Sequence, residues 1–142
     1  MLDKKLIKEK IKLIQEDLLH LKDYQNLSFD KVARDYVTHK VIERIIEVII
    51  NEAIDINQHL IVELGKGKLP FDYKESFLLL AELGILPQKF AEEISRSVGL
   101  RNILVHQYRK LDEKIFYHSI KDCLRQYSLY CSYILKYLDK NF

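Results

Sequence analysis

Residues 41–60, VIERIIEVIINEAIDINQHL, carry the pattern that sets the fold of this chain. Apolar side chains recur there at steps of four and three, which is the period of a helix with one buried face. This row is Ile42, Ile46, Ile49, Ala53, Ile56 and Leu60. The stretch predicts a long helix that packs on two sides or against a second copy of the chain, because another apolar row widens the buried face: Val41, Ile45 and Val48.

The segments on either side of this stretch also have helical character. Upstream, the same period predicts a helix from about Leu2 to Tyr24, followed by a short polar break at Asn26 and Ser28. Its apolar row is Ile7, Ile11, Ile14, Leu18 and Leu21. Downstream, GKGKLP, residues 65–70, ends the long helix, because glycine is a preferred C-terminal cap and proline cannot continue the backbone hydrogen bonds.

Three more helices are expected beyond that loop. Asp72 is a suitable N-cap for a short helix that Gly84 ends, and Pro87 stands at the start of the next, which buries Phe90, Ile94 and Val98. Asp112 is a suitable N-cap for the last helix, whose apolar row is Ile120, Leu124, Tyr127, Cys131, Ile134 and Leu138. The chain is therefore predicted to be all-α, an antiparallel bundle of four long helices plus a short one.

Length and composition restrict the classes of protein further. The chain has 142 residues, 48% hydrophobic and 31% charged, with a net charge of +2, which predicts a single globular domain over residues 1–142. No apolar run reaches the ~18 residues of a membrane span, and no histidines or cysteines have the spacing of a zinc site. On a helix, Cys123 and Cys131 lie out of disulfide reach. We expect a cytoplasmic protein without metal, cofactor or membrane contact.

Positive charge is concentrated in residues 94–111, ISRSVGLRNILVHQYRKL. This segment contains Arg96, Arg101, Arg109 and Lys110 and no acidic residue, whereas the other 19 basic residues are outnumbered by 21 acidic ones. Such a segment can bind a phosphate backbone, which makes RNA a candidate partner. The alternative is a cationic face exposed only to solvent.

The same segment contains residues suited to RNA cleavage. Cleavage without metal needs a base for the 2′-hydroxyl, an acid for the leaving oxygen and cationic donors for the phosphate, and His106 and Arg101 suit these tasks. On an ideal helix they are about 140° apart, whereas Asn102 shares a face with His106, and Tyr108 with Arg101. Two explanations remain open: a bend at Gly99 brings Arg101 and His106 together, or a second subunit completes the site.

VGLRNILVHQY, residues 98–108, resembles the Rx4HxY motif of the HepT-like toxins of the HEPN superfamily. The resemblance implies a HEPN-like helical bundle that dimerises, so that two motifs face one cleft, and a metal-independent endoribonuclease toxin acting on tRNA or mRNA. It implies that Arg101 and His106 are catalytic and that Asn102 and Tyr108 position substrate. Arg96, Arg109 and Lys110 are weaker candidates for RNA binding. Gln107 departs from the acidic residue that family members often carry.

The resemblance also implies a partner, a minimal nucleotidyltransferase antitoxin of the MntA type, which transfers AMP from ATP to Tyr108 to give O-AMP-tyrosine. The added phosphate and adenosine would block a cationic RNA cleft by bulk and by charge repulsion. The alternative function is a non-catalytic nucleotide-binding or regulatory subunit of such a nucleotidyltransferase. A helical interaction module without either activity is a third.

Other residues suggest simpler roles. Asp55 and His59 lie on one side of the long helix, where the carboxylate could orient the imidazole for chemistry. The favoured expectation is a local hydrogen-bonded pair or an interface contact. Histidines 20, 39 and 118 are assigned no role, because no partner at helical spacing is identified for them. The tyrosine row of the last helix, Tyr130, Tyr133 and Tyr137, is expected to pack against a neighbouring helix.

Overall fold

The computed structural model describes residues 1–142 and contains helices only, which confirms the predicted all-α class. Seven α-helices and one short 3-10 helix follow one another along the chain. None of them is long and apolar enough to cross a membrane. They are α1 (Lys4–Lys22), α2 (Phe29–Arg34), α3 (Tyr36–Leu64), α4 (Tyr73–Glu82), α5 (Gln88–Ser95), α6 (Ser97–His106), η1 (Tyr108–Lys110) and α7 (Glu113–Asn141).

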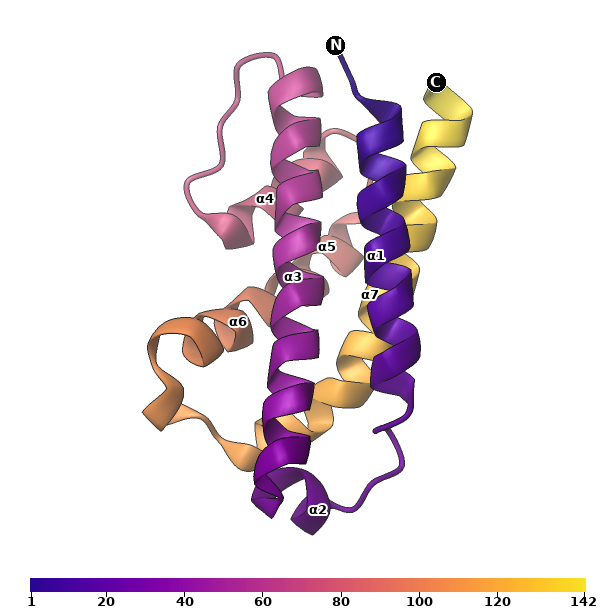
Figure 1. Ribbon diagram of the computed structural model, residues 1–142. Helices are drawn as coiled ribbons and strands as arrows, with labels where there is room; N and C mark the ends of the chain where they lie inside the picture. Colours follow the sequence, from indigo (N-terminus) through magenta and orange to yellow (C-terminus); the bar gives the residue numbers. More distant parts are fainter.

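The three longest helices form the body of the molecule (Figure 1). Helix α1 packs on both α3 and α7 and runs antiparallel to them, so the two ends of the chain lie close together. At these ends, the Lys4 ammonium donates to the Phe142 carbonyl over 3.1 Å. Helices α4, α5 and α6 follow one another along another side of α3, and α6 with the segment after it projects away from the bundle (Figure 1).

Hydrophobic side chains of all seven α-helices form one buried cluster. It includes every member of the α1 row and of the α3 row that begins at Ile42, and all of the α7 row except the half-buried Leu124. The second row of α3, Val41, Ile45 and Val48, is only half-buried within one chain. One face of α3 is therefore incompletely covered.

The tyrosines of α7 pack inward, as predicted. Tyr130 is fully buried, and its hydroxyl donates to Asn57 Oδ1 over 2.6 Å and to the Ala53 carbonyl over 3.1 Å. The ring of Tyr133 lies 5.0 Å from that of Phe90. Because the Tyr130 hydroxyl bonds to groups of α3, Tyr130 contributes to the core at little desolvation cost.

The number of helices differs from the prediction in two places. Helix α2 is an additional helix with a single buried side chain, Val32, and so has no apolar row to reveal it. The predicted fourth helix is two helices, α5 and α6, which meet at Arg96. On either side of this break the hydroxyls of Ser95 and Ser97 donate to carbonyls three residues earlier, a contact that competes with the helical hydrogen bonds.

The predicted caps are present. The Asp72 carboxylate accepts from the Glu75 amide over 2.8 Å at the start of α4, and Asp112 accepts from the first amides of α7. Gly84 follows α4 with a φ of +77°, a conformation that glycine adopts without strain. These short polar residues set where helices begin and end, and they place the segment containing the motif between α5 and α7.

Candidate active site

The motif residues lie on α6 and η1, beside α3. Val98 and Leu104 are the buried side chains that fix α6 to the core, and the motif side chains are half-buried or exposed. Arg101, Asn102 and His106 all belong to this one helix, and Tyr108 follows it directly in η1.

The hypothesis of a bend at Gly99 is wrong. Gly99 is the third residue of α6, and the break between helices lies upstream of every motif residue, at Arg96. Arg101 and His106 therefore keep the separation of about 140° that one helix imposes. A single copy of the motif does not turn these two side chains toward a common point.

The guanidinium of Arg101 is held from α3 and from its own helix. Its Nε donates to Asn51 Oδ1 over 2.8 Å, and one terminal nitrogen donates to Asn102 Oδ1 over 3.1 Å. The Tyr73 ring lies 5.1 Å from the guanidinium carbon. A guanidinium has five N–H groups, so three remain for an anionic ligand.

Asn51 and Tyr73 were not among the residues predicted for the site. Asn51 follows the apolar residues Val48, Ile49 and Ile50 of α3 but is itself followed by Glu52, so its local sequence gives no signal of a site. Tyr73 is the first residue of α4, and nothing in its local sequence points to Arg101.

His106 is the last residue of α6, and its side chain is exposed. It makes no hydrogen bond within the chain, so both ring nitrogens are available to a substrate. An imidazole can donate or accept a proton, which is what an acid or base in RNA cleavage must do.

Tyr108 is 42% exposed, and its hydroxyl faces α3, where it donates to Glu43 Oε2 over 3.3 Å. The Lys40 ammonium lies 4.1 Å from the centre of the Tyr108 ring. Partial burial and the negative charge of Glu43 raise the pKa of Tyr108, and Lys40 opposes this in part. The phenol is therefore protonated at neutral pH.

Behind Tyr108 is a buried polar group that was not predicted from the sequence. His39 is only 5% exposed; its Nδ1 lies 2.5 Å from Glu43 Oε2, and its Nε2 lies 2.8 Å from Glu113 Oε2 of α7. Its ring stacks on that of Phe116 at 4.4 Å. The prediction that His39 lacks a partner at helical spacing is wrong, because Glu43 is four residues later on the same helix.

The weaker RNA-binding candidates are divided between two places. Arg109 and Lys110 are exposed in η1, next to Tyr108, and neither forms an ion pair.

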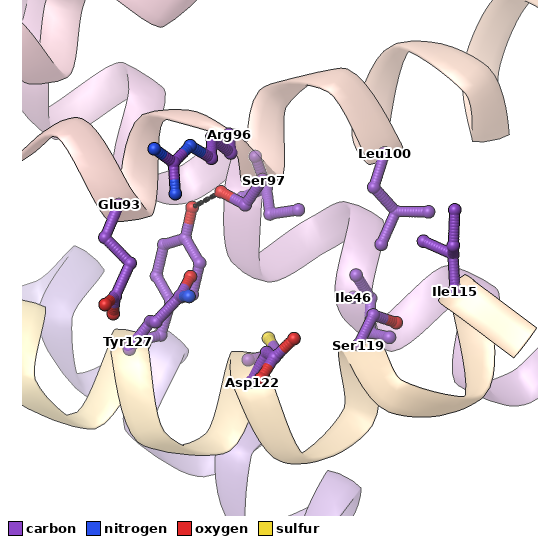
Figure 2. A pocket seen from close by; sticks show the side chains of 12 residues that line it. Ile46, Glu93, Arg96, Ser97, Leu100, Ile115, Ser119, Asp122 and Tyr127 are labelled. Atoms are coloured by element: carbon purple, nitrogen blue, oxygen red, sulfur yellow. Dashed lines mark hydrogen bonds between the residues drawn. The ribbon is translucent and has the colours of Figure 1, made fainter.

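Arg96 is at the joint between α5 and α6, where it lines a cavity of about 290 Å³ with Ser97, Asp122 and Tyr127 (Figure 2). The Ser97 and Tyr127 hydroxyls are 2.6 Å apart there. No residue of the motif from Arg101 to Tyr108 lines this cavity.

Asp55 and His59 do not bond to each other. Asp55 lies 3.6 Å from the Lys10 ammonium, and His59 Nε2 accepts from the Asp3 amide over 3.2 Å. Both residues therefore fasten α1 and its N-terminal end to α3, and the predicted local pair is wrong. Cys123 and Cys131 are buried free thiols.

Solved structures share this fold across the whole chain. A HEPN toxin of Shewanella oneidensis, solved tri-AMPylated and in complex with an MNT antitoxin, superposes with a TM-score of 0.83 at 22% identity, over 94% of this chain and 99% of that one. A cytosolic protein of unknown function from Bacillus subtilis, YutE, also gives 0.83 at 18% identity, over 99% and 94%. These similarities confirm the HEPN-like helical bundle.

Sequence relatives extend the comparison. A tRNA nuclease HepT from Aphanizomenon flos-aquae is 36% identical over 133 residues, which cover 94% of this chain and 90% of the relative. An mRNA nuclease HepT from Shewanella oneidensis is 32% identical over 81 residues, covering 57% of this chain and 60% of the relative. A family model described as ribonuclease HepT-like matches residues 14–134. These relatives confirm the predicted enzyme class, an endoribonuclease. The chain belongs to the ribonuclease HepT-like family.

Proposed function

We propose that this chain is the toxin of a toxin–antitoxin pair and cleaves cellular RNA, either tRNA or mRNA, without a metal ion. One observation carries the proposal: α6 presents an exposed, unbonded His106 and an Arg101 whose guanidinium is oriented by Asn51 with N–H groups to spare. The names of the two relatives support an RNA substrate, since they describe a tRNA nuclease and an mRNA nuclease.

The chemistry assigns a role to each motif residue. The 2′-hydroxyl attacks the neighbouring phosphorus, and His106 takes its proton or donates one to the leaving 5′-oxygen. Arg101 stabilises the extra negative charge on the phosphate oxygens. Asn102 and Tyr108 position the substrate. Arg109 and Lys110 extend the positive surface beside Tyr108, and Arg96 adds charge at the start of α6.

A homodimer completes this site. General acid–base cleavage needs groups on both sides of the phosphate, and one α6 turns Arg101 and His106 in different directions. Two copies of the motif facing each other would supply both groups. The half-buried α3 row Val41, Ile45 and Val48 supports such an association, because it leaves apolar surface uncovered in one protomer.

Inhibition is proposed to work through Tyr108, to which a nucleotidyltransferase antitoxin transfers AMP. The Tyr108 side chain is partly exposed beside Arg109 and Lys110, so an attached AMP would occupy the positive surface that RNA needs. The fold similarity to a tri-AMPylated toxin held by an MNT antitoxin supports this arrangement.

The decisive experiment is cleavage of total tRNA and of mRNA by the purified, unmodified chain in EDTA. His106→Ala should lower the rate about 10²–10⁴-fold, because it removes the acid–base group. His20→Ala is the matched control, since His20 is also exposed but lies on α1. Equal cleavage by wild type and His106→Ala would refute the assigned site. A wild-type chain that binds ATP or a nucleotidyltransferase but cuts no RNA would favour the regulatory-subunit alternative.

A further inference from the structure

The Tyr108 hydroxyl lies at one end of a row of polar side chains that runs into the protein. Glu43 Oε2 is 3.3 Å from this hydroxyl, 2.5 Å from His39 Nδ1 and 3.5 Å from the Lys40 ammonium. His39 Nε2 is in turn 2.8 Å from Glu113 Oε2. A single carboxylate oxygen of α3 therefore faces the hydroxyl, an imidazole and an ammonium.

This carboxylate is fixed in place. Glu43 is 8% exposed and His39 is 5% exposed, so solvent has little access to either. The His39 ring lies between two carboxylates, with Nδ1 at hydrogen-bond distance from Glu43 and Nε2 at hydrogen-bond distance from Glu113. The ring therefore links Glu43 to α7, and the Glu43 carboxylate faces the Tyr108 hydroxyl.

The hydroxyl needs such a partner if it is to act as a nucleophile. Burial and Glu43 raise the pKa of Tyr108, which keeps the phenol protonated at neutral pH. A neutral phenol is a weak nucleophile, and an adjacent general base activates groups of this kind. The geometry required of a base is hydrogen-bond reach of the proton to be removed, which often tightens only in the reactive complex.

We propose that Glu43 is the general base that activates Tyr108 for modification by a nucleoside triphosphate, an inference that rests on the AMPylation proposed above. The Tyr108 oxygen bonds to the α-phosphorus, the bond from that phosphorus to the bridging oxygen breaks, and pyrophosphate leaves. The phenol proton passes to the Glu43 carboxylate. Lys40, beside both the carboxylate and the ring, offsets negative charge as the phenol oxygen reacts.

His39 and Glu113 are positioning residues in this scheme. They touch no reacting atom and act by holding Glu43. This arrangement acts when the inhibited toxin is formed, because the Glu43 carboxylate faces the hydroxyl that accepts AMP.

The test measures transfer of α-labelled AMP from ATP to the full-length chain by its nucleotidyltransferase antitoxin, with the modified residue located by mass spectrometry. Glu43→Gln keeps the shape of the side chain and removes the base, so transfer should slow about 10²–10⁴-fold. Glu47→Gln is the matched control: it makes the same change one turn along α3, where Glu47 pairs with Arg44. The antitoxin should modify Tyr108 of this control variant at the wild-type rate.

A pH profile separates a base from a residue that only supports the structure. In Glu43→Gln only the ionised phenol reacts, so the rate should rise about tenfold per pH unit below the Tyr108 pKa, more steeply than in wild type. The other groups facing this site, His39 and Lys40 of α3 and Glu113 of α7, are the same in both proteins. The difference between the profiles therefore reports on Glu43.

A measurement without the antitoxin checks the contact itself. Titration of Tyr108 by NMR should give a lower phenol pKa in Glu43→Gln than in wild type, because the variant removes the negative charge that raises it. An unchanged Tyr108 pKa would overturn the inference even if the variant affected transfer.

The outcomes distinguish the role of Glu43 as the base from the AMPylation of Tyr108 itself. If wild type accepts AMP on Tyr108 and folded Glu43→Gln does so equally fast, Glu43 is not the base and the proposed regulation stands. If wild type accepts no AMP on Tyr108, the proposed regulation fails, and the inference fails with it.

Discussion

Removal of the Asn51 acceptor should uncouple Arg101 from its site without unfolding the protein. We choose Asn51→Leu, which keeps a side chain of similar length and deletes the oxygen that accepts from Arg101 Nε over 2.8 Å. Leucine is a better helix former than asparagine, so the change should not weaken α3 locally. The expected defect lies in cleavage of RNA.

The expected loss of RNA cleavage follows from the strength of the hydrogen bond between Arg101 Nε and Asn51 Oδ1. Hydrogen bonds to charged groups contribute about 1.5–3 kcal/mol, and the half-buried position of Arg101 reduces this to about 1–2 kcal/mol. If that free energy orients the guanidinium in the transition state, kcat/KM falls about 5- to 30-fold. Asn51→Asp should also lower activity, by a different route, because it keeps an acceptor but neutralises the charge that attracts phosphate.

The assay is single-turnover cleavage of an RNA substrate in EDTA, with thermal unfolding measured alongside. The control is to make Asn51→Leu in a protein that already carries Arg101→Ala. Without the guanidinium, Asn51→Leu should have no further effect on the cleavage rate, so the double-mutant cycle should show strong coupling between the two residues. Wild-type cleavage by a folded Asn51→Leu, or equal effects of this change with and without Arg101, would refute the idea that Asn51 orients the guanidinium.

Three further predictions concern stability. Gly99→Ala should raise the free energy of unfolding by about 0.5–1 kcal/mol in urea, because a Cβ there meets nothing within 4 Å; lower stability would contradict this. Tyr130→Phe should cost about 1–3 kcal/mol, since the buried hydroxyl bonds to Asn57, whereas Tyr133→Phe should cost less. Bonds from Thr38 lower the pKa of the Asp35 carboxyl that caps α3, so its stabilisation is present above the ordinary carboxyl pKa and is lost as pH falls through the lowered value. Acid titration of Asp35→Ala should show a smaller loss than wild type.

Local features of the sequence were sufficient for most of the helices. The rows beginning at Ile7 and Ile42 repeat with the helical period, and the core contains every member of both. Asp72 and Asp112 cap helices because a carboxylate bonds to amides two or three residues later, a contact that depends on no other part of the chain. The α5–α6 break escaped prediction because serines rather than glycine or proline accompany it.

The sequence by itself determined the all-α class, the helix caps and the motif from Arg101 to Tyr108, because helical period, capping and motif spacing are properties of neighbouring residues. Only the tertiary structure decided what meets that motif. Asn51 reaches Arg101 across 50 positions of sequence, and Glu43 reaches Tyr108 across 65. Such pairs form only when α6 and η1 pack beside α3, and that packing depends on the whole core rather than on any segment read alone.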